Sequence, residues 1–274
     1  MMAAVSPVAG NWFIVPMNIF VFDIETVPDV EAGRRLYGLD DLDDKNVGRV
    51  MFHKRAAESG GSEFLRHHLH RIVAISVVLS TADKFKVWSL GDPDSAESEL
   101  LQRFFDGIER FTPTLVSWNG SGFDLPVIHY RSLLHGIAAP RYWDTGSDDK
   151  NFKWNNYLSR FHERHTDMMD VLAGYQPRAV ARLDEIATLL GFPGKMGMDG
   201  SKVWDSFQAG AIGDIRDYCE TDVLNTYLVY QRFELIRGHI SAAQYQQMCE
   251  QVRSALQQEQ RPHLDEFLHN WQDS

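Results

Sequence analysis

Near its amino terminus the chain reads Asn18-Ile19-Phe20-Val21-Phe22-Asp23-Ile24-Glu25-Thr26. The aromatic and β-branched residues over 18–24 predict a buried β-strand. Successive side chains of a strand point to opposite faces, so we expect Asp23 and Glu25 to share one face while Ile24 enters the core. Two carboxylates at the end of an apolar strand repel each other, and they therefore require a cation or a basic partner.

Two later phrases also place carboxylates in apolar surroundings, where an unpaired charge is costly to bury. They read Asn119-Gly120-Ser121-Gly122-Phe123-Asp124 and Tyr218-Cys219-Glu220-Thr221-Asp222. Asp124 begins a helix expected over residues 124–135, where the helix dipole favours an acid. Tyr218 and Asp222 are four residues apart in a helix expected over residues 212–236, so they lie on one helical face.

Taken singly, these residues have ordinary explanations: Asp124 could be only a helix N-terminal acid, and Tyr218 only a core aromatic. Taken together, the strand, the mid-chain helix start and the late helix supply four carboxylates that predict a site for hard divalent cations. An all-oxygen site fits Mg²⁺ or Mn²⁺, whereas Zn²⁺ prefers nitrogen and sulfur ligands. The four acids are Asp23, Glu25, Asp124 and Asp222.

In this order the phrases resemble the three sequence motifs of DEDD-type 3′–5′ exonucleases, most closely the proofreading domain of family B DNA polymerases. The resemblance extends to Leu183–Ala187, Leu190–Lys195 and Gly200–Trp204, which are similar to a stand-alone subfamily related to those domains. It covers roughly residues 17–237, and no polymerase motifs follow. It implies a ribonuclease H-like α/β fold, in which α-helices flank a central mixed β-sheet.

The resemblance also implies a subtype and a role for each acid. In the histidine subtype a His lies five residues before the last Asp; here that position is Asp217 and the next residue is Tyr218, which indicates the tyrosine subtype. By resemblance, Asp23 bridges two divalent ions, Mg²⁺ or Mn²⁺. Glu25 and Asp222 complete the site that activates water, and Asp124 holds the second ion largely through water. Tyr218 hydrogen-bonds the attacking water.

Four further residues are candidates for substrate binding. Asn119 matches the family position that contacts the substrate strand, although an Asn in a turn before a helix is an equal alternative. Phe123 could stack on a terminal base or belong to the core. Lys195 and Lys202 lie in or beside the Gly-rich stretch 191–200, where they could meet phosphates or be solvated.

The composition of the chain limits the ligands and the cellular locations that we expect for it. The formal net charge of −11 argues against adhesion to nucleic acid through a broad basic surface, but it permits contact with phosphates through bound cations. No stretch reaches 18 apolar residues, so we expect no membrane span. Residues 1–16 lack the charged start of a secretory signal, and we interpret them as a ragged extension. The cysteines, Cys219 and Cys249, indicate reduced thiols and a cytoplasmic location.

Local patterns predict the remaining elements. Residues 28–66 should be an insertion with one or two short helices, followed by a hairpin of strands at 71–80 and 84–90. Further strands are expected at 113–118 and 166–171, and further helices at 95–111, 183–190 and 241–258. We expect one domain over 17–237 and a helical extension of it over 238–274, whose polar tail is anchored by Phe267 and Trp271; the extension could instead dock a partner.

Three other sets of residues have candidate roles. His67, His68 and His70 lack a Cys partner and helical spacing, so we expect them at the surface or at the entry to the sheet rather than on a metal. Asp167 and Asp170 should lie within the fifth strand, one of them near the site. Cys219 should pack inward as a small apolar residue.

The sequence thus predicts a metal-dependent 3′–5′ exonuclease that acts on single-stranded ends, favours DNA and releases nucleoside 5′-monophosphates. One alternative is a 3′–5′ exoribonuclease, and another is a non-catalytic nucleic-acid or partner-binding module on the same fold. A replication or repair protein is a candidate partner. The sequence leaves the oligomeric state open.

Overall fold

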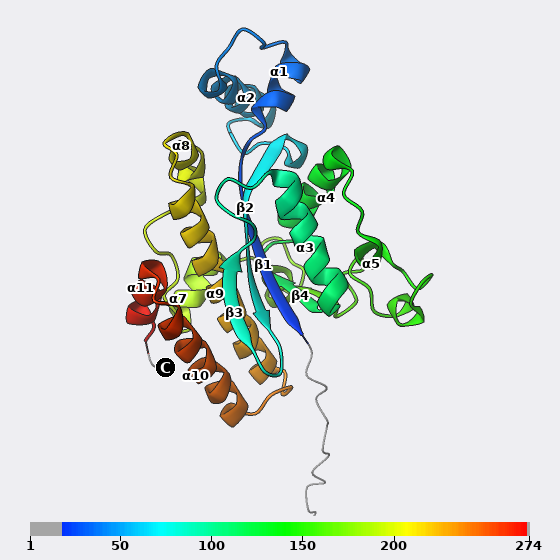
Figure 1. Ribbon diagram of the computed structural model, residues 1–274, viewed down its shortest axis with the longest axis vertical. Coiled ribbons are helices and arrows are strands. Elements are labelled where there is room, and N and C mark those ends of the chain that lie inside the picture. Colours follow the sequence, from blue (N-terminus) through cyan, green and yellow to red (C-terminus); the bar gives the residue numbers. More distant parts are fainter. Residues whose placement is uncertain (1–17, 273–274) are drawn as a thin grey trace, which may run out of the picture.

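We describe residues 18–272 of a computed structural model; the extension expected over 1–16 lies outside them. A single five-stranded sheet has the order β3-β2-β1-β4-β5 (Figure 1). Strand β2 runs antiparallel to its neighbours β1 and β3, whereas β4 is parallel to β1 and β5 is parallel to β4. This order and these directions define the ribonuclease H-like fold, which confirms the predicted fold class. The strands are β1 (Ile19–Pro28), β2 (His70–Ser80), β3 (Phe85–Ser89), β4 (Thr114–Ser117) and β5 (His165–Asp167).

Alternation along β1 sends side chains into two helical layers. Phe20, Phe22 and Ile24 belong to one buried cluster, which includes residues of α3 (Glu97–Phe111) and α4 (Asp124–His135). Val21 belongs to another, which is formed mainly with α9 (Ile212–Ile236). Asp23 and Glu25 follow Val21 at steps of two, so they face α9, while Ile24 is buried in the opposite layer as predicted.

The region after α9 folds back over the sheet. It forms α10 (Ala242–Glu259), close to the helix expected over 241–258, and α11 (Pro262–Asn270), a second helix within the polar tail that had been predicted without one. Phe267 is fully buried and Trp271 nearly so, in the same cluster as the inner face of α9. These contacts support the proposal that residues 17–237 and 238–274 form one domain.

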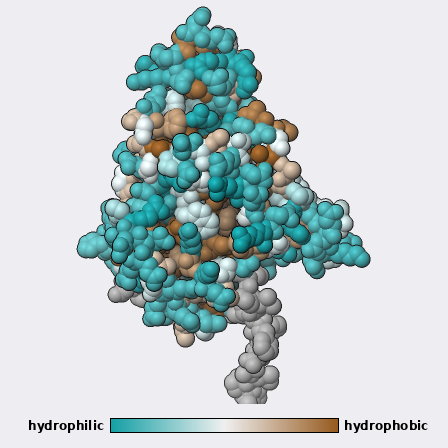
Figure 2. Space-filling model, in the orientation of Figure 1, coloured by the Kyte–Doolittle hydropathy of each residue, from teal (hydrophilic) through white to brown (hydrophobic). Residues whose placement is uncertain are grey.

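The insertion after β1 forms a small subdomain of two helices, α1 (Val30–Tyr37) and α2 (Asp44–Ser59), of which the second is longer than the predicted short helices. Its own core contains Val47, Met51 and Leu65. The subdomain projects from one end of the sheet, and its outer surface is hydrophilic (Figures 1 and 2).

Two strand boundaries differ from the prediction. Strand β1 continues to Pro28, and its register with β2 shifts between Glu25 and Thr26, so the two carboxylates lie within the strand beside a bulge. Strand β5 ends at Asp167, because this side chain accepts hydrogen bonds from the backbone N–H groups of Met169 and Asp170 and thereby caps α6 (Met168–Leu172).

The remaining elements are short. They are η1 (His67–Leu69), α5 (Pro140–Trp143), η2 (Lys150–Lys153), α7 (Leu183–Leu189), η3 (Gly200–Lys202) and α8 (Val203–Gln208). The three histidines lie at the entry to β2 as predicted. No helix within residues 18–272 is both long enough and apolar enough to cross a membrane.

Candidate active site

The four predicted acids converge where β1 meets α4 and α9. The backbone N–H of Ile24 donates to Oδ1 of Asp124 over 3.1 Å, which fixes the start of α4 against the strand. Burial raises the pKa of Asp23 well above its ordinary value. The negative charges of Asp124, Glu25 and Asp222 lie close enough to raise it further. Burial and the charges of Asp222 and Asp124 likewise raise the pKa of Glu25.

Burial is also the main cause of the raised pKa of the other two acids. Burial raises the pKa of Asp124 to about 7, although the hydrogen bond from Ile24 acts in the opposite direction. Burial also raises the pKa of Asp222 to about 7, against the effects of a hydrogen bond from Tyr218 and of the charge of Lys195. Without a cation to neutralise them, these carboxyl groups take up protons at a higher pH than isolated acids do. Such a group is suited to binding cations.

The thiol of Cys219 adjoins this group. Cys219 is fully buried, as predicted, and its Sγ lies 3.5 Å from both the carbonyl oxygen and Oδ2 of Asp23. Burial raises the pKa of Cys219 well above its ordinary value, and the charges of Asp23 and Glu25 raise it further. The sulfur therefore stays protonated and donates to Asp23, so the ligand atoms available to a cation are oxygens. The contact joins residues 196 positions apart and has no local sequence signal.

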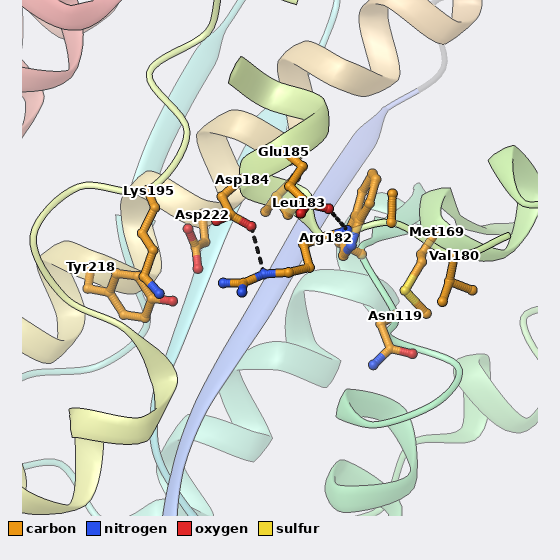
Figure 3. A pocket seen from close by; sticks show the side chains of 12 residues that line it. Asn119, Met169, Val180, Arg182, Leu183, Asp184, Glu185, Lys195, Tyr218 and Asp222 are labelled. Carbon is orange, nitrogen blue, oxygen red and sulfur yellow. Dashed lines mark hydrogen bonds and ion pairs between the residues drawn. The ribbon is translucent and has the colours of Figure 1, made fainter. Parts of the chain in front are cut away.

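A pocket of about 380 Å³ opens beside the acids. Tyr218, Asp222 and Lys195 lie together on one side of it, and Asn119 and Met169 lie across from them (Figure 3). The Tyr218 side chain lies near enough to Asp222 for the two groups to affect each other's pKa, as expected for residues one helical turn apart. Burial and then the charges of Asp222, Glu25 and Asp23 raise the pKa of Tyr218. Its hydroxyl is therefore a hydrogen-bond donor and not a base.

The loop that carries Asn119 is held by Asp167. Oδ1 of Asp167 accepts from the backbone N–H of Asn119 at 2.9 Å, and Oδ2 accepts from that of Ser121 at 2.8 Å. Asn119 adopts a left-handed backbone with φ of 62°, a conformation that asparagine tolerates better than most residues. The prediction that one of two acids lies near the site is confirmed for Asp167, which orders the loop before α4, while Asp170 belongs to α6 and not to the fifth strand.

Phe123 lies half-buried at the start of α4. Its ring centre is 5.0 Å from that of His70, 5.8 Å from that of His67 and 5.3 Å from that of Phe64. Phe64 itself is 57% exposed. The structure thus places Phe123 between the core and an exposed aromatic, next to Asp124.

The two candidate lysines occupy different places. Lys195 lines the pocket, and its Nζ lies 3.5 Å from Oδ2 of Asp199. Its loop is held by the buried Asn225, whose side chain donates to the carbonyl of Gly194 at 2.9 Å and accepts from its N–H at 3.2 Å. Lys202 is exposed and lines a second cavity of about 290 Å³, which Tyr218 separates from the first.

A second polar cluster lies behind the face of α9 that carries Tyr218 and Asp222, and no sequence pattern indicated it. Glu220 is 1% exposed and accepts hydrogen bonds from the backbone N–H and hydroxyl of Ser89. Arg261 binds Glu220 at 2.7 Å and Asp217 at 3.0 Å, and His263 also reaches both acids. Because a guanidinium already neutralises these carboxylates, they form an ion-pair network and not a cation site.

Comparisons with known proteins identify a family for the chain. A family model described as "Predicted 3'-5' exonuclease related to the exonuclease domain of PolB" matches residues 62–271. The match includes Asp124, Tyr218 and Asp222, whereas Asp23 and Glu25 precede it.

Two larger proteins are similar to parts of the chain. The catalytic polypeptide of DNA polymerase epsilon from Saccharomyces cerevisiae is 49% identical over 45 residues, which make up 16% of this chain and 2% of that protein. The family B DNA polymerase of the hyperthermophilic archaeon Pyrobaculum calidifontis aligns over 77% of this chain and 24% of the polymerase, with a TM-score of 0.47 and 17% identity. The chain therefore spans only a small part of the length of either relative.

The family match covers well over half of the chain and confirms the resemblance inferred from the motifs. The protein belongs to the family of predicted 3′–5′ exonucleases that are related to the exonuclease domain of PolB.

Proposed function

We propose that the protein is a metal-dependent 3′–5′ exonuclease that hydrolyses phosphodiester bonds at the 3′ end of single-stranded DNA and releases nucleoside 5′-monophosphates. The observation that carries the proposal is the convergence of four carboxylates, one of which, Asp222, lines a pocket together with Tyr218. DNA is favoured because the family is related to a domain of PolB and the yeast relative is named as a DNA polymerase. A replication or repair protein is then the class of partner that would supply such ends.

Two divalent cations, Mg²⁺ or Mn²⁺, would complete the site. Asp23, Glu25, Asp124 and Asp222 offer carboxylate oxygens, the ligands that these hard ions prefer. When bound, such a pair lowers the pKa of a coordinated water and neutralises charge on the attacking and leaving oxygens. Burial raises the pKa of all four acids, and the charges of neighbouring acids raise those of Asp23 and Glu25 further, so the group fits positive charge.

The residues of the chain then position the reactants. We assign Tyr218 to orient the attacking water, because its hydroxyl stays protonated beside Asp222. We assign Asn119, Phe123 and Lys195 to hold the terminal nucleotides, because two of them line the pocket and Phe123 adjoins Asp124. Lys202, one cavity away, would meet a more distant phosphate.

Purified protein incubated with Mn²⁺ and with oligonucleotides labelled at the 3′ or the 5′ end tests the proposal directly. We expect stepwise shortening from the 3′ end and nucleoside 5′-monophosphate as the product. Matched DNA and RNA strands decide between deoxyribonuclease and ribonuclease, since the discrimination depends on contacts with the 2′-hydroxyl. If no strand is shortened, or if Asp23→Ala retains the activity, the proposal fails; Mn²⁺ binding without cleavage would favour a non-catalytic module.

Replacing Tyr218 by Phe should lower kcat about 10- to 100-fold and leave KM nearly unchanged. The substitution removes one hydrogen bond to the attacking water but preserves the ring and the carboxylates. Single-turnover kinetics and calorimetric titration with Mn²⁺ provide the measurement. Tyr37→Phe, on α1 and distant from the pocket, is the matched control. Loss of Mn²⁺ binding in the Tyr218 variant would contradict a role confined to the water.

Mn²⁺ should stabilise the protein more at pH 8 than at pH 5. The folded-state pKa values of the four acids are raised, so their protonated forms stabilise the cation-free fold at low pH, and this contribution is lost as the pH rises through about 7. Thermal unfolding with EDTA and with Mn²⁺ at both pH values tests this expectation. An equal shift of Tm at the two pH values would show that the cation binds elsewhere.

A further inference from the structure

Arginine and aromatic side chains form an exposed group around Arg160. The guanidinium of Arg160 lies 4.9 Å from the ring centre of Phe161 and 5.8 Å from that of Tyr175. Phe161 is 80% exposed, Tyr175 is 44% exposed, and the Tyr175 hydroxyl donates to the carbonyl of Arg160 at 3.2 Å. Arg178, also exposed, follows three residues after Tyr175. We name these four residues the arginine–aromatic surface.

The chain connects this surface to the active-site pocket at two points. Burial raises the pKa of Asp170, and the guanidinium of Arg160 is close enough to oppose that rise. Asp170 directly follows Met169, which lines the pocket. From Arg178 the chain continues to residues 180–182, which also line it.

The segment that carries this surface is not acidic, although the whole chain is. Residues 160–182, which include the whole surface, contain four arginines and three acidic residues, a net charge of +1 in a chain with a net charge of −11. Arg182 is paired with Asp184 at 3.1 Å. In contrast, neither Arg160 nor Arg178 forms a salt bridge with a carboxylate of the described part of the chain. Arg178 thus forms no salt bridge within the described residues, and Arg160, whose charge also acts on Asp170, lies against two exposed rings.

We propose that the arginine–aromatic surface binds the part of a single-stranded substrate that lies on the 5′ side of the bond cleaved in the pocket. Guanidinium groups neutralise phosphates, and exposed rings stack on bases whatever their sequence. The inference rests on the proposed function, which places the 3′ end among the four acids. DNA and RNA share the phosphates and the stacking bases, so the surface accepts either strand.

Strand binding is measured by fluorescence anisotropy with labelled 20-nucleotide DNA and RNA in Ca²⁺. We expect the double variant Arg160→Ala and Arg178→Ala to raise Kd about ten-fold and to reduce the slope of log K against log salt by about 1.4, because each phosphate contact on a single strand contributes about 0.7. Phe161→Ala should raise Kd about ten-fold with no change of slope, because stacking releases no counterions.

The double variant Arg103→Ala and Arg110→Ala is the matched control. It removes the same charge from exposed positions of α3, and Arg110 stands 5.1 Å from the ring centre of Phe111 in the same way that Arg160 stands over Phe161. We expect the control to bind the oligonucleotide like the unmodified protein. Thermal unfolding of every variant verifies that the fold is retained.

The length of the substrate gives a second readout. The fold loss of kcat/KM in the Arg160 and Arg178 variant should increase from a dinucleotide to a 20-nucleotide strand, since only the longer strand reaches the surface. A loss independent of length, or a Kd and salt slope equal to those of the control, would overturn the inference. If the unmodified protein binds strands through this surface but cleaves none, the proposed function fails and the binding surface stands.

Discussion

Asp23→Asn should lower kcat by about 10³-fold or more, while the cation-free protein becomes more stable. Asp23 is the acid on which the charges of the other three all act, so its carboxylate is the one best placed to contact more than one cation. An amide of the same size keeps the shape of the site but removes the negative charge. The expected loss of activity therefore results from the missing charge and not from altered packing.

The same substitution relieves the repulsion that raises the pKa of this carboxyl. Stability without cations should increase, with a Tm higher by about 2–4 °C for each kcal/mol gained. Activity is measured with Mn²⁺ on a labelled strand, and Tm is measured in EDTA. Asp83→Asn, in the exposed β2–β3 hairpin, should change neither value. A variant that retains activity, or that loses stability in EDTA, would show that Asp23 is not at the centre of a cation site.

Elements with strong local signals were predicted from the sequence with accurate bounds. The helices expected over 124–135 and 212–236 are observed at those residues, because apolar periodicity and terminal residues mark both. Alternation in β1 correctly placed Asp23 and Glu25 on one face. The fifth strand was predicted too long because the side chain of Asp167 caps a helix there, and capping outweighs the strand preference of the following residues.

Contacts between distant residues could not be predicted in this way. Asp167 holds Asn119 across 48 positions, and Cys219 contacts Asp23 across 196. Neither residue has a spacing that indicates its partner, because the contact exists only after the sheet has formed. The four acids were recognisable because carboxylates in apolar stretches require a cation or a basic partner, and because local spacing places them on defined faces of a strand and of helices. The side chains that support them have ordinary sequence surroundings.

Glu220→Gln should destabilise the fold by about 3 kcal/mol, the largest loss we expect from a residue outside the pocket. Glu220 lies on α9 between Tyr218 and Asp222 in sequence, but it is turned away from the pocket toward β3 and α11. Burial alone would raise the pKa of Glu220. Hydrogen bonds from His263 and Ser89, together with the charge of Arg261, instead hold it below its ordinary value.

The sign of the pH dependence follows from this lowered pKa. A carboxylate with a depressed folded-state pKa stabilises the fold above its unfolded-state pKa of about 4.3, and this contribution is lost as the pH falls through the folded-state value. Urea unfolding should therefore show a large difference between the Glu220→Gln variant and the unmodified protein at pH 7, and the difference should shrink below pH 4. Glu250→Gln, on the exposed face of α10, should stay within about 0.5 kcal/mol of the unmodified protein.

A double-mutant cycle measures the coupling between Glu220 and Arg261. Arg261→Ala alone and Glu220→Gln alone each leave a partner uncompensated, so their effects on stability should not add when they are combined.

Activity should fall with Glu220→Gln as well, because α9 carries both Tyr218 and Asp222 and depends on α11 for its position. If stability fell but single-turnover kinetics in excess Mn²⁺ were unchanged, the C-terminal helices would stabilise the fold without positioning Tyr218 and Asp222 on α9.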